Sequence, residues 1–104
     1  MSAIPVLIRY DTFGYHAIGV YLYIDEMTFL LNRDKILADM ISLSKEFQGV
    51  LELVEKTSIF GNTSFLIRIS FSGESNNTAL SYFIRTLQLE DYKLTSYFDY
   101  NGSE

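Results

Sequence analysis

The stretch that most constrains the fold is YHAIGVYLYID, residues 15–25, in which two sets of apolar side chains alternate. Alternation with a period of two is typical of a β-strand, because successive side chains point to opposite faces of a sheet. One set consists of His16, Ile18, Val20, Leu22 and Ile24, and the other of Tyr15, Ala17, Gly19, Tyr21 and Tyr23. Both sets are mainly apolar or aromatic, so we expect a central strand that is covered on both faces.

The rest of the chain indicates further strands separated by two helices. We expect strands at 4–10, 50–60, 63–72 and 93–100, and helices at 32–49 and 78–88. Asn32 is placed to cap the first helix, Gly49 to stop it, and Pro5 suits an edge strand. The apolar stripe of the first helix is expected to contain Ile36, Leu37, Met40, Ile41 and Phe47.

This order of elements predicts the fold class. A strand–helix–strand–strand–helix–strand series after a short extra N-terminal strand is the plan of an α+β ferredoxin-like sandwich, here one domain over residues 1–104. Right-handed crossovers would place both helices on one sheet face. The other face would carry Tyr21, Tyr23 and Tyr97, an aromatic surface of unusual size. We therefore expect a homodimer or higher oligomer with these tyrosines at its interface; the alternative is a register that places the rings over the helices.

Composition narrows the function classes. The absence of Cys excludes disulfides, thiolate nucleophiles and Cys-based metal sites. The net charge is −5, and the eight Lys and Arg residues form no basic run, so we expect no direct nucleic-acid binding. No apolar stretch reaches the roughly 18 residues that span a bilayer, and the N-terminus lacks the basic region of a signal peptide. We expect a cytoplasmic protein without membrane contact.

Residues that often carry chemistry form no convincing site. His16 is the single histidine, and an alternating strand more often buries such a residue than uses it as a base. Asp25 and Glu26 would point in different directions if the strand continues, which argues against a shared acid–base pair. We expect no catalytic residue, metal or cofactor, and hence a non-enzymatic protein; an enzyme that works with one His or Tyr is a minor alternative.

Several segments resemble a known family. RYDTFGYHAIGVYLYI is similar to the "D…LGY" turn and first strand of the ligand-sensing RAM domain of the Lrp/AsnC (leucine-responsive regulator) family. GVLELVEK resembles the strand after that domain's first helix, and FGNTSFLIRI resembles its hairpin, commonly Thr-Gly-x-Tyr-Asp before an aliphatic strand. The likeness spans about residues 11–100.

The resemblance implies a domain that dimerises through its sheets, often assembles further, and binds a small effector such as an amino acid at the hairpin. Carried over by position, the candidate corner is Gly61-Asn62. Phe60 stands where the family usually has Thr, and Thr63-Ser64 stand where it has Tyr-Asp. The implied ligand-binding residues are therefore Phe60, Gly61, Asn62, Thr63 and Ser64. A plain tight turn is the alternative for this corner.

The family's DNA-binding helix-turn-helix has no room before Asp11, so we expect no DNA-binding domain here. The chain would be a stand-alone sensing domain or a fragment of a longer regulator. Its partners would be further copies of itself and either a small metabolite or a full-length regulator. The leading hypothesis is thus a non-enzymatic effector-binding and oligomerisation domain of transcriptional-regulator type. The alternative is an acidic ferredoxin-like protein-interaction, inhibitor or immunity protein.

Overall fold

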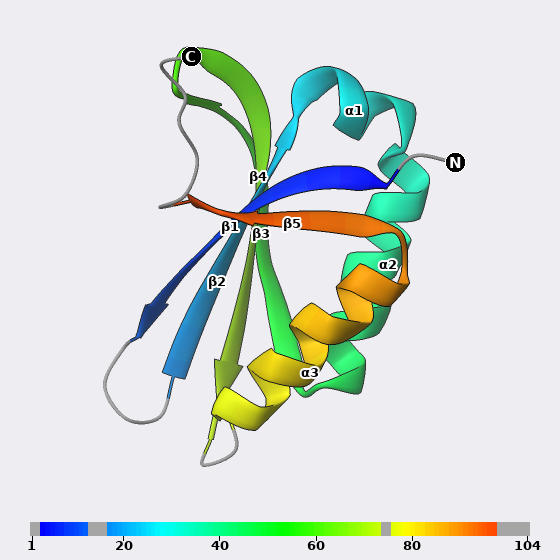
Figure 1. Cartoon of the computed structure of the whole chain (residues 1–104). Helices are drawn as coiled ribbons and strands as arrows, with labels where there is room; N and C mark the ends of the chain where they lie inside the picture. Colours follow the sequence, from blue (N-terminus) through cyan, green and yellow to red (C-terminus); the bar gives the residue numbers. More distant parts are fainter. Residues whose placement is uncertain (1–2, 13–16, 74–75, 98–104) are drawn as a thin grey trace.

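The computed structural model describes residues 3–12, 17–73 and 76–97, which form a five-stranded sheet and three helices (Figure 1). The elements in chain order are β1 (Ile4–Thr12), β2 (Ala17–Asp25), α1 (Glu26–Leu31), α2 (Arg33–Glu46), β3 (Gly49–Ile59), β4 (Asn62–Ser72), α3 (Asn76–Leu89) and β5 (Tyr92–Ser96). The α+β class expected from the sequence is confirmed. His16 and residues 98–100 of the last expected strand lie outside the described residues.

The sheet is mixed, with the strand order β3-β4-β2-β1-β5. β1 pairs parallel with β5, and the other three pairs are antiparallel. The expectation of a short extra strand at an edge is wrong, because β1 has nine residues and lies between β2 and β5. The arrangement is compatible with a ferredoxin-like α+β fold, but the inserted strand separates β5 from β2.

Pro5 is tolerated inside this sheet because β1 is not yet paired with β2 at this position. The backbone N–H of Ile4 donates to the carbonyl of Asp91 at 2.8 Å, on the β5 side of β1. The nitrogen of the next residue, Pro5, therefore faces the β2 side, where pairing begins only at Leu7 opposite Tyr23. The missing N–H of proline breaks no ladder hydrogen bond, and β1 and β2 diverge at this end.

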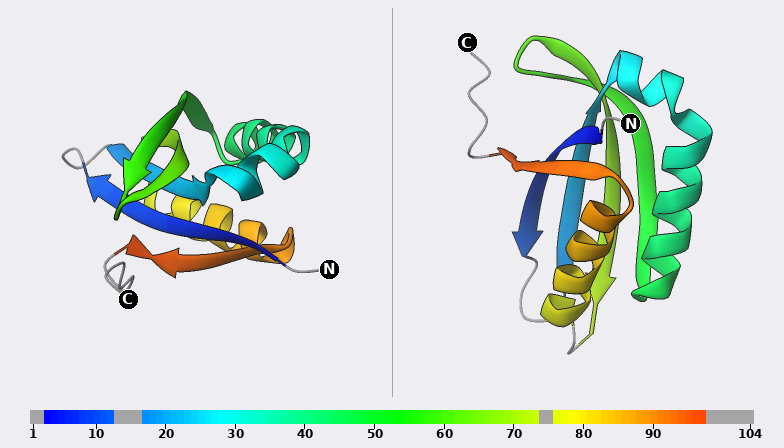
Figure 2. Two further views of the ribbon diagram at one scale, coloured as in Figure 1. Left: turned by 90° about the horizontal axis from the view of Figure 1, so that it is seen from above. Right: turned by 45° about the vertical axis from the view of Figure 1, so that its right-hand side comes forward.

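The core lies between the sheet and the three helices, which all cover the same sheet face (Figure 2). The alternating strand residues expected to face inward do so, and Val20, Leu22 and Ile24 are completely buried. Helix residues complete the layer, with Phe29 of α1 stacking on Phe65 at a ring separation of 4.2 Å. The buried helix residues of the core are Phe29, Ile36, Met40, Leu43, Phe83 and Leu87. Ile41, expected in the stripe of α2, is instead 43% exposed.

The expected first helix corresponds to α2, which begins at Arg33 as predicted and ends at Glu46, earlier than expected. A separate helix that was not expected, α1, precedes it and starts at Glu26 directly after β2. Asn32 sits at the N-cap position of α2 but makes no side-chain cap bond; its Nδ2 donates instead to the carbonyl of Thr28 at 2.9 Å.

None of the helices in the described ranges has the length and apolar character needed to cross a membrane.

Gly49 does not stop the helix. α2 ends at Glu46, Gln48 adopts the left-handed φ of 61°, and Gly49 already belongs to β3. A Cβ on Gly49 would lie 2.7 Å from the ring of Phe71. The glycine is therefore needed for close packing of the strand against that ring rather than for a helix stop.

The β3–β4 hairpin turns one residue earlier than expected. Ile59 pairs with Asn62, so the two corner residues are Phe60 and Gly61, with φ of 50° and 81°. Positive φ at both positions is the pattern of a type I′ turn. Figure 1 shows this hairpin bending away from the helices. Phe60 holds a left-handed conformation that costs a non-glycine residue about 1–3 kcal/mol.

Candidate functional site

The sheet surface opposite the helices, which we call the free face, is neither apolar nor simply solvated. It consists of the strand residues that alternate with the core positions on β1, β2 and β4. Tyr21 lies between Arg9 and Arg68 in the strand register, and Tyr23 lies between Leu7 and Leu66. Tyr21 and Tyr23 are therefore on the side predicted from the sequence, and the alternative register that would place them over the helices is wrong.

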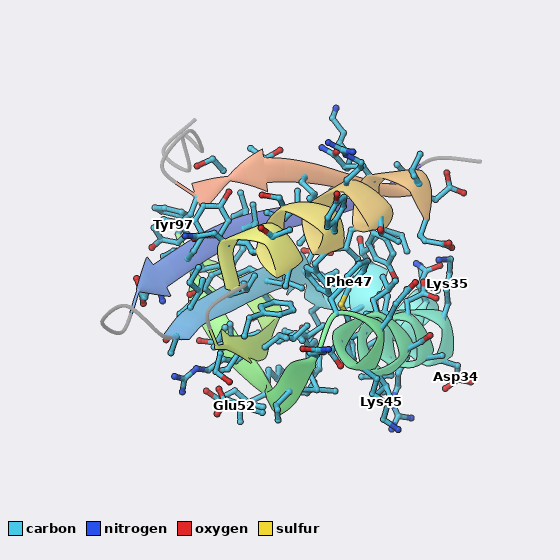
Figure 3. All side chains as sticks on the ribbon, turned by 90° about the horizontal axis from the view of Figure 1, so that it is seen from below. Asp34, Lys35, Lys45, Phe47, Glu52 and Tyr97 are labelled. Carbon is cyan, nitrogen blue, oxygen red and sulfur yellow. The ribbon has the colours of Figure 1, made fainter. Side chains whose placement is uncertain are left out.

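Aromatic rings and arginines interact across the free face in what we call the Tyr–Arg cluster, consisting of Arg9, Tyr21, Tyr23, Arg68 and Tyr97. The guanidinium carbon of Arg9 lies 4.1 Å from the ring centroid of Tyr21 and 5.8 Å from that of Tyr97. Arg68 lies 5.5 Å from the Tyr21 ring, and the rings of Tyr23 and Tyr97 are 5.7 Å apart. These separations are typical of cation–π and tilted aromatic contacts. Figure 3 shows Tyr97 on the opposite side of the molecule from Lys35 on α2.

Both arginines of the cluster have acidic partners nearby. Arg9 Nη1 lies 2.9 Å from Asp11 Oδ2, and Arg68 Nε lies 3.4 Å from Glu52 Oε1. Burial opposes the charge on Arg9, but a 3.3 Å hydrogen bond from Nη2 to the Tyr23 hydroxyl and the negative charge of Asp11 outweigh it and raise the pKa of Arg9. Each of the two arginines of the cluster thus has an acidic side chain nearby that offsets its charge.

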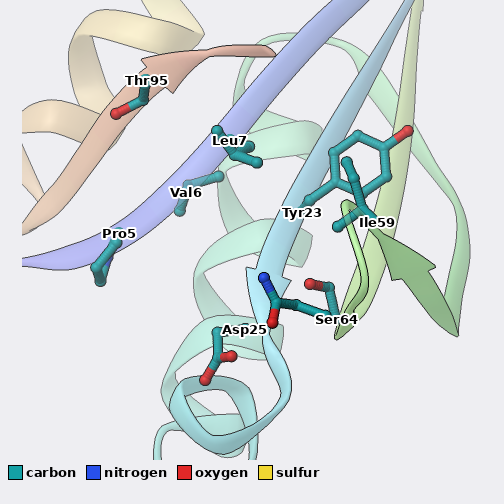
Figure 4. A pocket seen from close by; sticks show the side chains of 9 residues that line it. Pro5, Val6, Leu7, Tyr23, Asp25, Ile59, Ser64 and Thr95 are labelled. Carbon is teal, nitrogen blue, oxygen red and sulfur yellow. The ribbon is translucent and has the colours of Figure 1, made fainter. Parts of the chain in front are cut away.

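A hollow of about 220 Å³ lies at the end of the sheet where β1 and β2 diverge. We call it the hairpin pocket, and the described residues lining it are Pro5, Val6, Leu7, Tyr23, Asp25, Ile59, Asn62, Ser64 and Thr95. Figure 4 shows Asp25 and Ser64 near one end and Thr95 near the other. Pro5, Val6 and Leu7 follow one side along β1, and Ile59 and Tyr23 lie across from them.

Two of the five residues predicted to bind a ligand line this pocket. Asn62 and Ser64 do so, and Ser64 is only 5% exposed. Gly61 and Thr63 are exposed and do not line it. Phe60 is displaced toward the free face, where its ring lies 5.3 Å from that of Tyr97. The hairpin therefore contributes Asn62 and Ser64 to the pocket and Phe60 to the free face.

Most of the pocket could not be predicted from the sequence, in which Asp25 suggests at most one half of an acid–base pair with Glu26. The structure separates these two carboxylates: Glu26 lies 2.8 Å from Lys56 Nζ, whereas Asp25 caps α1 and lines the pocket. A signal was available, because an Asp at a strand–helix junction is a typical N-cap and must lie at a sheet end. Thr95 and the three β1 residues could not be found, since strand order alone brings them there.

The arrangement offers a ligand a carboxylate acceptor, side chains that both donate and accept hydrogen bonds, and apolar walls rather than a reactive pair. The carboxylate of Asp25, the amide of Asn62 and the hydroxyl groups of Ser64 and Thr95 are its polar side chains, with the phenol of Tyr23 at its border. Within residues 3–12, 17–73 and 76–97, no three His, Cys, Asp or Glu side chains are grouped as a metal site would need. Comparison of the chain with protein-family models, with curated proteins and with solved structures found no match.

Proposed function

We propose that this chain is a non-enzymatic domain that binds a small effector in the hairpin pocket and associates with a second copy through its free face. This is the mode of action implied by the resemblance to the Lrp/AsnC effector domains. The observation that carries the proposal is the position of Tyr23. Its side chain lines the pocket, and its ring and hydroxyl belong to the Tyr–Arg cluster.

Charge supports association through the free face. Two copies of a chain with net charge −5 repel each other over most of their surfaces. The repulsion is reduced where Arg9 and Arg68 are offset by Asp11 and Glu52. Tyr and Arg are also the residues most enriched at protein–protein interfaces and their energetic hot spots. The free face thus combines low electrostatic cost with the side chains that such interfaces use.

The shape and lining of the hairpin pocket support binding of a small effector. Binding sites are concave and mostly apolar, with a few polar groups that set orientation, and drug-sized ligands need roughly 300–1,000 Å³. The hairpin pocket is smaller, about 220 Å³, and has this composition. Two of its lining residues, Asn62 and Ser64, belong to the hairpin, and the resemblance places the effector at this hairpin. The effector would be smaller than a typical drug molecule.

The association is tested by reversing one charge on each side of the sheet. Arg9→Glu places a third acidic group beside Asp11 on the free face, whereas Arg85→Glu makes the same net change on the exposed surface of α3. Because juxtaposed like charges cost several kcal/mol at an interface, Arg9→Glu is expected to weaken dimerisation at least about tenfold. Sedimentation equilibrium over a range of concentrations measures the dimer constant. Arg85→Glu should leave it unchanged, and equal effects of both variants would contradict the proposed interface.

A second function, an acidic interaction or inhibitor protein, is favoured by the surface of α1. Met27, Leu30 and Leu31 are 67%, 53% and 78% exposed there, and exposed apolar side chains that gather on one element mark interaction sites. This surface lies at the end of the sheet rather than on the free face. A wild-type chain that stays monomeric throughout the micromolar range would favour this function over the first.

A further inference from the structure

The hairpin pocket is electrostatically one-sided. Of its nine described lining residues, Asp25 is the one that carries a carboxylate, and none is Arg, Lys or His. Arg9, the closest cation identified in the Tyr–Arg cluster, bonds to the Tyr23 hydroxyl and to Asp11 on the free face and does not line the pocket. A ligand in this pocket therefore meets the Asp25 carboxylate and no cationic side chain among the described lining residues; Lys93 of β5 is paired with Pro5 in the strand register but does not line the pocket.

Asp25 is held at the polar end of the pocket by the fold. It is the last residue of β2 and the N-cap of α1, and its Oδ2 accepts a long hydrogen bond of 3.4 Å from the Thr28 N–H. An ionised carboxylate has about four lone-pair sites on two oxygens. The cap thus orients the carboxylate and leaves acceptor capacity for a ligand. Ser64, directly opposite Asp25 in the strand register, adds a hydroxyl group at the same end.

Apolar groups form the walls away from this end. Pro5, Val6 and Leu7 present hydrocarbon from β1, and Ile59, which is 8% exposed, presents it from β3 (Figure 4). A volume of about 220 Å³ accommodates a short aliphatic chain but not a large ring system. The polar end and the apolar walls together match a molecule with one charged head and a short hydrocarbon tail.

We infer that the ligand of the hairpin pocket is a small aliphatic amine in its ammonium form, an inference that rests on the proposed effector binding. The ammonium group donates to Asp25 and Ser64, and the alkyl chain packs along Leu7 and Ile59. A zwitterionic amino acid is the poorer ligand, because its carboxylate would find no cationic side chain among the described lining residues. Asn62, Ser64 and Thr95 can donate hydrogen bonds to that carboxylate, but they do not neutralise its charge, and Asp25 repels it.

Three probes of similar size test the charge requirement: n-butylamine, butan-1-ol and butanoate, each titrated into ¹⁵N-labelled protein. The amine is expected to shift the amide signals of Leu7, Asp25 and Ser64 and to saturate. The alcohol should bind at least about tenfold more weakly, because its hydroxyl group carries no positive charge to pair with the Asp25 carboxylate. Butanoate should cause no saturating shift of these signals. The amine affinity should also fall with added salt, because the carboxylate is partly exposed.

The matched variants are Asp25→Asn and Asp34→Asn. Asn is as good an N-cap as Asp, so Asp25→Asn keeps α1 capped while removing the charge. Asp34 is an exposed residue in the first turn of α2 and does not line the pocket, so Asp34→Asn makes the same charge change elsewhere. Asp25→Asn should weaken amine binding at least about tenfold and alcohol binding by less, whereas Asp34→Asn should change neither.

The outcomes separate the inference from the proposed function. If the alcohol or butanoate binds as well as the amine, or if Asp25→Asn binds the amine like the wild type, the amine assignment is overturned while ligand binding at the pocket stands. If none of the three probes shifts the lining residues, effector binding at this pocket fails as well. The dimer measurement with Arg9→Glu does not depend on either result.

Discussion

The two faces of the sheet are made by the same strands and differ in almost every property. On β2, Val20, Leu22 and Ile24 are completely buried under the helices, while Tyr21 and Tyr23 alternate with them on the free face, half-buried among charged groups. The helix-covered face is close-packed with aliphatic and phenylalanine side chains, and the free face carries tyrosines and ion-paired arginines. The difference teaches that strict alternation can assign stability to one side of a strand and recognition to the other.

The sharpest test of this division substitutes two neighbours on β2. Leu22→Ala removes a fully buried side chain and is expected to lower the free energy of unfolding by about 2–5 kcal/mol, because the removed methyl groups leave a cavity. Tyr21→Ala removes mainly cation–π contacts at a partly exposed site, worth about 0.5–1 kcal/mol for each contact. Urea unfolding measured under conditions where both variants are monomeric gives the two values. Similar losses would mean that the free face is as important for stability as the core.

A second test adds volume to the close-packed face. Gly49→Ala places a methyl group 2.7 Å from the ring of Phe71, and overpacking of this kind costs about 1–3 kcal/mol. The double variant Gly49→Ala with Phe71→Leu removes the ring atoms that clash. Its loss of stability should be smaller than the sum of the two single losses, because residues in contact are coupled. Additive losses in thermal or urea unfolding would show that the clash is relieved by movement of the strand.

The smallest effect concerns Tyr92, the one tyrosine in the buried core among the described residues. Tyr92 is 2% exposed and its hydroxyl donates to Asp39 Oδ2 at 2.8 Å. Burial and this hydrogen bond to Asp39 raise the pKa of Tyr92 above the ordinary phenol value of 10.0. The folded state therefore keeps a proton that the unfolded state loses above about pH 10, and stability falls as pH rises there, by at most about 1.4 kcal/mol per pH unit.

Tyr92→Phe should remove the part of the alkaline stability loss that comes from ionisation of Tyr92. It should also lower the free energy of unfolding by about 1 kcal/mol at neutral pH, where the hydrogen bond is intact in the wild type. Urea unfolding at neutral pH and at several values above pH 10 compares the variant with the wild type. Asp39 keeps its 2.6 Å ion pair with Lys35 in the variant, which limits the loss. Identical alkaline slopes for the two proteins would show that Tyr92 ionises equally in the folded and unfolded states.

Local patterns predicted the class of fold and the faces of its strands. Tyr21 and Tyr23 were placed on the free face correctly, because alternation is a property of the strand itself. The details of the turns were less accurate. The hairpin corner is Phe60-Gly61 rather than Gly61-Asn62, because a phenylalanine adopts a left-handed φ that its residue type disfavours. Gly49 is required by the ring of Phe71, which lies on a different strand and cannot be inferred from the helix that precedes the glycine.

The residues of the candidate site likewise divide into those that a local sequence feature indicates and those that only the folded structure brings together. Asn62 and Ser64 were named from the hairpin, a local feature, and they line the pocket. Asp25, Pro5 and Thr95 join them from other strands, because β1 is inserted between β2 and β5 and diverges from β2 at one end. No periodicity in the sequence specifies this insertion, because strand order depends on which strand edges pair with one another as the chain folds.

The sequence by itself determined the order of the five strands and of α2 and α3 along the chain, the two-sided character of β2 and the acidic balance of the chain. These follow from short-range periodicity and composition, which act within a few residues. Only the tertiary structure decided the place of β1 in the sheet, the ion pairs of Arg9 and Arg68 on the free face and the hairpin pocket with Asp25 among its lining residues. Each of these joins residues that are far apart in the chain, and such contacts arise from the pairing and packing of whole elements.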